Sequence, residues 1–273
     1  EFDYRHVCRA RLIPGRSQNA GRVPAPHSER VVALSSRLNG RSALVTGASR
    51  GIGSAIARSL ATDGARVALV ARSAEALRQL AGEIGRGAFA VPCDVTDDSA
   101  VKAMAGEVEA ILGSAPDLVI NNAGVFQVSR LDSMPPAMFD EVMSTNLFGP
   151  FYVVTAFIKQ MRDRGTGHFV TVGSIADRAI FPENGAYAPA KHALRALHEV
   201  LREELKGSGV RATLVSPGPV DTAMWDGIAF GGEERTVPSA NARLTPDDVA
   251  AAVLYAVTQP ASVNVDELRL SHS

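Results

Sequence analysis

Seven short aliphatic segments separated by longer helical patterns are the feature of this sequence that most constrains its fold. Most are continuous apolar runs, as expected for strands of a parallel sheet covered on both faces. We expect strands at Ala43–Val45, Arg66–Ala71, Ala88–Cys93, Leu118–Asn121, His168–Val172, Arg211–Ser216 and Val263–Leu270. This alternation predicts an α/β fold, a single doubly wound Rossmann-type domain with a mostly parallel seven-stranded sheet.

Capping signals place helices between these strands. Thr96–Asp98 and Thr245–Asp247 each combine a capping side chain with acidic residues in the first turn of a helix. A further helix is expected to begin near Gly185–Ala186, because a first turn is where a helix tolerates the ring of Pro189. The glycines of Gly207–Gly209 suit the end of that helix.

The beginning of the chain differs in composition from the rest. Residues 1–41 hold eight arginines against three acidic residues, and they show no periodic apolar pattern. We therefore expect residues 1–40 to lie outside the fold and residues 41–273 to form the domain. A disordered native extension, an organellar transit peptide and a segment foreign to the natural protein remain open as explanations.

Composition argues against several classes of function. The net charge of −1 gives no broad basic field for a nucleic acid or a membrane surface. Two cysteines, Cys8 and Cys93, are too few for a disulfide framework or a structural zinc site, so we expect a reducing compartment, the cytoplasm. His168 and His198 lack further ligands at metal-binding spacing, and no metal site is expected.

A glycine-rich loop follows the first expected strand, and a helical pattern begins directly after it. Small residues let such a loop approach a pyrophosphate, whose charge then lies at the positive helix N-terminus. The loop, Thr46-Gly-Ala-Ser-Arg-Gly-Ile-Gly53, resembles that of the short-chain dehydrogenase/reductase family, Thr-Gly-x-x-x-Gly-x-Gly. The resemblance implies cofactor contacts for Gly47, Ser49, Arg50, Gly51, Ile52 and Gly53.

The end of the second strand indicates which dinucleotide binds. An NAD enzyme places an acidic residue about 20 residues past this loop, on the ribose 2′-hydroxyl. This sequence has Arg72 there, and Arg50 lies within the loop itself. Two guanidinium groups can hold a 2′-phosphate through charge-assisted hydrogen bonds. We therefore predict NADP as the cofactor, which in the resembling family is typical of its NADP-preferring branch.

Further motifs of that family recur downstream in the same order. Asp94 and Val95 follow the third strand, where the family contacts adenine, although Asp94 could instead cap a helix. The Asn-Asn-Ala-Gly motif implies nicotinamide-ribose contacts, and the Pro-Gly motif after the sixth strand implies contacts with the carboxamide. The residues concerned are Asn122, Ala123, Gly124, Pro217, Gly218, Val220 and Thr222.

Four residues match the catalytic positions of the family in order and spacing: Asn146, Ser174, Tyr187 and Lys191. Tyr187 and Lys191 are four residues apart in a helical stretch, so both project from one face. A nearby ammonium and an oxidised nicotinamide both favour phenolate, which would lower the phenol pKa from about 10. Tyr187 would then act as general acid in carbonyl reduction and as general base in alcohol oxidation.

The resemblance also assigns supporting roles to the other three residues. Ser174 would donate a hydrogen bond to the substrate oxygen, which stabilises the charge that develops there. Lys191, together with Tyr187, would bind the nicotinamide ribose, and Asn146 would hold a water molecule in a proton relay. The predicted activity is thus the interconversion of a ketone or aldehyde and an alcohol.

Substrate and partners are less constrained by the sequence. Residues 223–241 look like a mobile lid in which Trp225 either contacts substrate or anchors the lid. The stretch Phe148–Met161 is apolar nearly all round, which favours a homodimer or homotetramer. The segment Val263–Leu268 resembles the branch that acts on small 3-hydroxy acids. A 3-oxoacyl-thioester reductase and a non-catalytic nucleotide-binding regulator remain alternatives.

Overall fold

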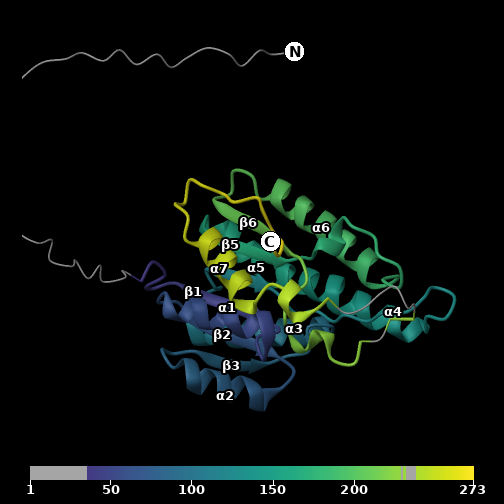
Figure 1. Ribbon diagram of the computed structural model, residues 1–273. Helices are drawn as coiled ribbons and strands as arrows, with labels where there is room; N and C mark the ends of the chain where they lie inside the picture. Colours follow the sequence, from purple (N-terminus) through teal and green to yellow (C-terminus); the bar gives the residue numbers. More distant parts are fainter. Residues whose placement is uncertain (1–35, 229, 232–237) are drawn as a thin grey trace, which may run out of the picture. The chain divides into compact units, whose positions relative to one another are not determined.

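Seven parallel strands form one sheet in the computed structural model, which describes residues 36–228, 230–231 and 238–273 (Figure 1). The strand order reverses between β1 and β4, which is where an open sheet of this kind builds its ligand crevice. The predicted doubly wound Rossmann-type domain is confirmed, and every strand pair is parallel. In spatial order the strands are β3 (Phe89–Pro92), β2 (Arg66–Ala71), β1 (Ser42–Thr46), β4 (Leu118–Asn121), β5 (Gly167–Val172), β6 (Val210–Pro217) and β7 (Glu267–Leu270).

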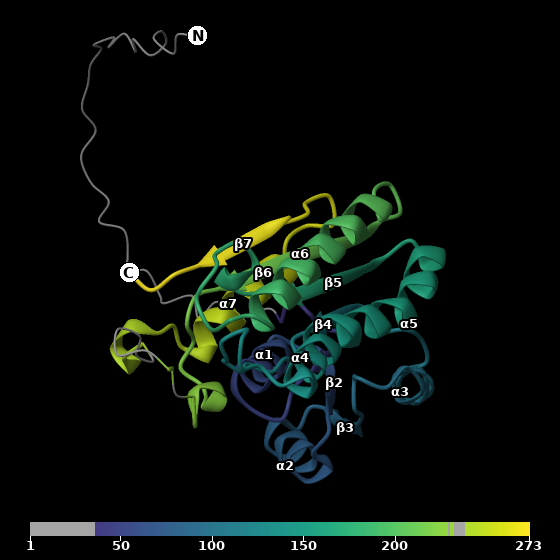
Figure 2. The ribbon, with the colours of Figure 1, turned by 90° about the vertical axis from the view of Figure 1, so that its right-hand side faces the viewer.

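Helices cover both faces of the sheet, as Figure 2 shows with the view turned. The face that carries the Val45 and Ile120 side chains packs against α1 (Gly51–Thr62), α2 (Ala74–Ile84) and α7 (Pro246–Val257). The opposite face packs against α3 (Asp98–Leu112), α5 (Gly149–Arg164) and α6 (Tyr187–Glu204). A further helix, α4 (Pro136–Met143), runs into α5 through a π-helical turn at Ser144–Phe148. None of the helices in the described ranges is long and apolar enough to span a membrane.

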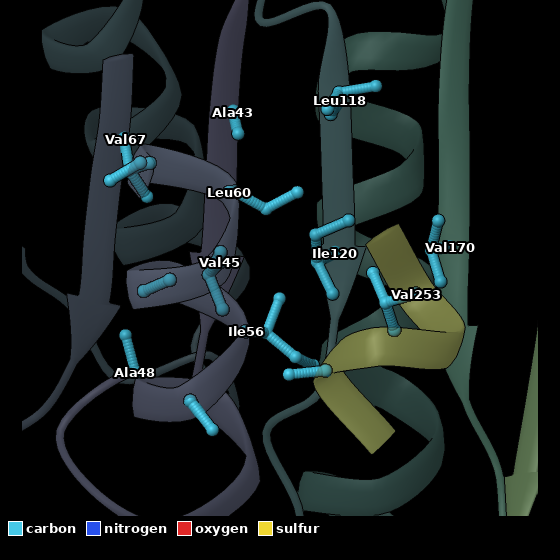
Figure 3. Packing of buried hydrophobic residues seen from close by; sticks show 14 of the residues in the cluster. Ala43, Val45, Ala48, Ile56, Leu60, Val67, Leu118, Ile120, Val170 and Val253 are labelled. Carbon is cyan, nitrogen blue, oxygen red and sulfur yellow. The ribbon is translucent and has the colours of Figure 1, made fainter. Parts of the chain in front are cut away.

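The core between the sheet and its first helical layer is aliphatic. Figure 3 shows Ile56 and Leu60 of α1 and Val253 of α7 among the strand side chains of Val45 and Ile120. All five side chains are fully buried, and burying a side chain of this size contributes about 1.5–3 kcal/mol. Branched aliphatic residues therefore supply the packing on this face.

Helix starts follow the capping chemistry of the sequence. Asp97 caps α3 by accepting hydrogen bonds from two backbone N–H groups, and Thr245 forms a capping box with Asp248 at the start of α7. Tyr187 is the first residue of α6, which places Pro189 in its first turn as predicted.

The two ends of the described chain depart from the sequence-based boundaries. The predicted extension over residues 1–40 lies, for residues 1–35, outside the described residues, whereas Leu38 is buried in the core. The last strand begins at Glu267, not at Val263 as predicted. The reason is that the Asn264 side chain, not a strand backbone, pairs with the N–H and carbonyl of Ala212, at 3.2 and 3.1 Å.

Candidate active site

Loops that follow six of the parallel strands line a cavity of about 1090 Å³. Parallel strands end at one edge of a sheet, so residues that are distant in the sequence meet there. All of the predicted catalytic and cofactor-binding residues line this cavity. They are Gly47, Ser49, Arg50, Gly51, Ile52, Gly53, Arg72, Asp94, Val95, Asn122, Ala123, Gly124, Asn146, Ser174, Tyr187, Lys191, Pro217, Gly218, Val220 and Thr222.

The glycine loop packs so tightly that Gly47 and Gly53 have no room for a side chain. Gly47 adopts a φ of 65°, in the left-handed region that favours glycine. A Cβ on Gly53 would lie 2.2 Å from the carbonyl oxygen of Gly47 and 2.6 Å from Asn122 Nδ2. The third glycine of the motif is therefore required by packing within the loop.

Thr46, at the end of β1, ties this loop to the one after β4. Its hydroxyl accepts the backbone N–H groups of Asn122 and Ala123 at 3.0 and 3.1 Å and donates to the carbonyl of Ile120. The Asn122 side chain in turn donates to the Thr46 carbonyl at 2.9 Å. The two loops of the cavity floor thus hold each other in place.

The start of α1 and two arginines provide what a phosphorylated dinucleotide requires. The first turn of α1 contains no acidic residue and no capping side chain, so its N–H groups are available to an anion. Arg50 and Arg72 are exposed at the cavity wall, and neither forms an ion pair with any residue in the described part of the chain. A dinucleotide with an additional phosphate fits these three features: the tight glycine loop, the available N–H groups at the start of α1, and the two arginines without an ion pair.

Asp94 does not cap a helix. Its Oδ1 accepts hydrogen bonds from the backbone N–H and the hydroxyl of Thr96, at 3.0 and 2.8 Å, and the cap of α3 is Asp97. Asp94 lines the cavity wall, and its contact with adenine stays a prediction.

Three of the four predicted catalytic side chains lie together. Ser174 caps a short 3-10 helix, Ile175–Asp177, and forms a hydrogen bond with Tyr187. Lys191 lies one turn further along α6, where its ammonium is 5.7 Å from the centroid of the Tyr187 ring. Lys191 Nζ also donates to the carbonyl of Val172 at 3.2 Å, which fixes it at the end of β5.

Burial, not attraction by Lys191, dominates the titration of this pair. Desolvation raises the pKa of Tyr187 to about 12; the hydrogen bond with Ser174 acts against this rise, and the charge of Asp177 adds to it. Desolvation also lowers the pKa of Lys191 to about 8, against the opposing effect of Asp177. The pKa of Tyr187 is therefore shifted in the direction opposite to the predicted one, because a buried phenolate loses more hydration than its neighbours return.

Asn146 occupies the π-helical turn between α4 and α5. Its Oδ1 accepts from the N–H of Val125 at 3.0 Å, and its Nδ2 donates to the carbonyl of Val125 at 2.8 Å. Both polar atoms of the side chain are thus engaged by one backbone residue. A Cβ on Gly124 would lie 2.8 Å from Asn146 Oδ1, so the family's Asn-Asn-Ala-Gly motif ends in glycine here for steric reasons.

An aromatic wall beside Tyr187 was not predicted from the sequence. The Phe126 ring meets the rings of Tyr187 and Trp225 edge to face, with centroids 4.8 and 5.4 Å apart. Trp225 both lines the cavity and is anchored, because its Nε1 donates to the Val220 carbonyl at 2.8 Å. The sequence feature that could have indicated Phe126 is its position two residues after Gly124, the last residue of the Asn-Asn-Ala-Gly motif.

The predicted lid is described only in part. Its residues 223–228 and Phe230 line the cavity, with the exception of Gly227, whereas residues 229 and 232–237 lie outside the described residues. No cluster of three or more His, Cys, Asp or Glu side chains that could hold a metal ion occurs in the part of the chain that the structure describes.

Comparison with known proteins places this architecture in one family. The family model for short chain dehydrogenases matches residues 41–229. The chain belongs to the short-chain dehydrogenase family. It is 35% identical over 232 residues to an uncharacterised oxidoreductase of Staphylococcus haemolyticus, covering 85% of this chain and 96% of that protein.

Solved structures of short-chain dehydrogenases share the fold and about a third of the residues with this chain. An alcohol dehydrogenase from the archaeon Thermococcus sibiricus, complexed with 5-hydroxy-NADP, is 34% identical with a TM-score of 0.75, covering 85% of this chain and 96% of that one. A serine dehydrogenase from Escherichia coli is 29% identical with a TM-score of 0.72, covering 84% and 96%.

Proposed function

We propose that this short-chain dehydrogenase is an NADP(H)-dependent oxidoreductase that interconverts a ketone or aldehyde and an alcohol, with Tyr187 as general acid and base. The observation that carries the proposal is the meeting of Ser174, Tyr187 and Lys191 in the same cavity as the glycine loop. The similarity to an alcohol dehydrogenase complexed with an NADP derivative supports it.

The preference for NADP over NAD rests on two side chains. Arg50 and Arg72 line the cavity at the loops after β1 and β2, where they would grip the 2′-phosphate of the adenine ribose. The N–H groups at the start of α1 would receive the pyrophosphate, and Lys191 the nicotinamide ribose. When bound, the cofactor supplies the hydride and, in its oxidised form, a positive charge.

The residues of this chain then transfer one proton to the substrate oxygen. The buried Tyr187 is a neutral phenol at physiological pH, so in reduction it can donate its proton to the carbonyl oxygen as hydride reaches the carbon. The Ser174 hydroxyl, already hydrogen-bonded to Tyr187, would stabilise the developing negative charge on that oxygen. The Asn146 side chain, proposed to hold the water molecule of a proton relay, is fixed by its two hydrogen bonds to the backbone of Val125.

The described wall beside Tyr187 suits an uncharged, apolar carbonyl compound. Phe126, Trp225 and Phe181 line it, and Asp226, which would repel a carboxylate, lines the same cavity. Two similarities favour small 3-hydroxy acids instead. The segment Val263–Leu268 resembles the branch that acts on such acids, and the chain is similar to a serine dehydrogenase. We propose that an apolar ketone is reduced faster than a 3-oxo acid of similar size, because the cation beside Trp225, the Arg243 guanidinium, is already paired with Asp221.

Tyr187→Phe tests the proposed chemistry. The variant keeps the ring that packs against Phe126 and removes the phenol hydroxyl, the group of this side chain that exchanges a proton. We expect NADPH binding, followed by cofactor fluorescence, to persist while NADPH consumption with a panel of ketones, 3-oxo acids and 3-oxoacyl thioesters is lost. Turnover equal to wild type would refute the catalytic assignment, and a wild type that binds NADPH without any turnover would favour a regulator.

We further propose that the protein is a homodimer or homotetramer that pairs through α5 and α6. Val153, Phe157 and Met161 of α5 are fully buried against the sheet. On the outer side, however, Phe148 of the preceding π-helical turn and Phe151 of α5 are 45% and 43% exposed. These two rings border a hollow of about 400 Å³ that Leu197 of α6 also lines, and an apolar face of this kind is typical of a subunit interface.

A further inference from the structure

Asp177 is a fully buried carboxylate directly beneath the catalytic serine. It ends the short 3-10 helix that Ser174 caps, and its N–H donates to the Ser174 carbonyl at 2.9 Å. A buried carboxylate is costly unless it is paired. The sequence reading gave this residue no role.

Two partners from distant parts of the chain satisfy this carboxylate. Oδ2 accepts from the hydroxyl of Ser216, the residue of β6 that precedes the cofactor motif at Pro217. Oδ1 accepts from Nε of Arg178 at 2.7 Å, and the same guanidinium reaches Glu267 of β7. One carboxylate therefore joins the serine turn to the two strands at the edge of the sheet.

The Asp177–Ser216 pair also presses against the backbone that holds the serine. A Cβ on Gly173 would lie 2.8 Å from Ser216 Oγ and 3.0 Å from Asp177 Oδ2. Gly173 immediately precedes Ser174, so a shift of the carboxylate would be transmitted to the catalytic hydroxyl.

The negative charge acts on both titrating groups of the site. It favours the ammonium of Lys191 and disfavours the phenolate of Tyr187. Other charged groups in the surroundings are Arg178, beside Asp177, and Asp226 in the lid segment. Of these three groups, Asp177 is the one whose charge raises the pKa of both Tyr187 and Lys191.

We propose that Asp177 is a positioning residue of this active site, which fixes the Ser174 turn on β6 and holds one negative charge behind the catalytic pair. The inference rests on the proposed function, since it concerns the same Tyr187 chemistry. Because Arg178 neutralises part of the carboxylate, the pair provides two substitutions with opposite expected effects.

The test is the pH profile of kcat for alcohol oxidation with NADP⁺, in which the deprotonated form of Tyr187 is the active one. Asp177→Asn keeps the shape and removes the charge, so the rising limb should move to lower pH by about one unit, at the low end of what a neighbouring charge does. Arg178→Gln leaves the carboxylate without its cation, so the limb should move to higher pH. The KM for NADP⁺ should stay within about twofold of wild type in Asp177→Asn.

Glu267→Gln is the matched control, because Glu267 contacts the outer end of Arg178 and not Asp177. Its profile should superimpose on that of wild type. The inference is refuted if Asp177→Asn leaves the limb in place, or if all three substitutions move it in one direction, as general loosening would. If Asp177→Asn does not fold, the upward shift in Arg178→Gln decides alone. An active Tyr187→Phe would instead remove the proposed function, independently of these profiles.

Discussion

Two buried histidines should make the fold sensitive to mild acid. His168 of β5 and His198 of α6 are almost fully buried, and each has one ring nitrogen bonded to a threonine hydroxyl, at 2.8 Å for Thr213 and 2.9 Å for Thr171. The other nitrogen of each ring has no hydrogen-bond partner among the described residues. Protonation would thus place an unpaired N–H and a charge in the core. Burial is the main reason that the pKa values fall to about 3 for His168 and about 4 for His198.

The size of the effect follows from linkage between protonation and folding. Each of these histidines has a lower pKa in the folded state than its reference value near 6.5. Below about pH 6.5 the unfolded chain therefore binds more protons than the folded chain. The stabilising contribution of each histidine is complete above about pH 6.5 and is lost progressively as the pH falls toward the folded pKa. Between pH 7.5 and pH 5.0 each histidine should cost about 2 kcal/mol in the free energy of unfolding, and the pair about 4 kcal/mol.

Urea unfolding followed by circular dichroism at the two pH values measures this difference. His198→Gln should halve the pH dependence, even if it lowers stability at both pH values, because the comparison is made within each variant. His192→Gln, on the same helix but only partly buried, is the control and should keep the full dependence. An equal pH dependence in wild type and His198→Gln would refute the reasoning.

Three other substitutions test the cofactor site and the interface. Gly53→Ala should abolish NADPH binding in a fluorescence titration, because its methyl would collide with the Gly47 carbonyl, whereas Gly106→Ala on α3, with open space around it, should bind normally and gain about 0.5–1 kcal/mol of stability. Arg72→Asp should raise the KM for NADPH at least tenfold more than that for NADH, an interaction difference of about 1.4 kcal/mol or more. Phe151→Glu should shift the protein to a smaller species in sedimentation, since it charges an apolar face.

Each of these has an outcome that would contradict it. Normal NADPH affinity in Gly53→Ala would mean that the loop can open, against the 2.2 Å contact. Equal effects of Arg72→Asp on the two cofactors would remove the argument for NADP. An unchanged sedimentation coefficient in Phe151→Glu would place the subunit interface elsewhere or leave the protein monomeric.

Local order along the chain made most of the site predictable. Gly47 and Ser174 could be placed at one edge of the sheet because parallel strands bring their carboxyl ends together there. The roles of Ser174 and Tyr187 came from the family's motifs, which this sequence repeats in order and spacing. Periodicity likewise gave the parallel sheet, and Pro189 gave the start of α6. The start of β7 was misjudged because Asn264 imitates a strand backbone with its side chain, which no apolar pattern reveals.

The sequence itself determined the glycine loop, the alternation of strands and helices, and the strand that each catalytic residue follows. Each of these depends on residues that are neighbours along the chain. The direction of the Tyr187 pKa and the partners of Asp177 were decided only by the tertiary structure. Asp177 and Ser216 are 39 residues apart, and Arg178 and Glu267 are 89 apart. Burial and pairing depend on which distant segments pack together, and a carboxylate or phenol has the same local sequence whether it is solvated or enclosed.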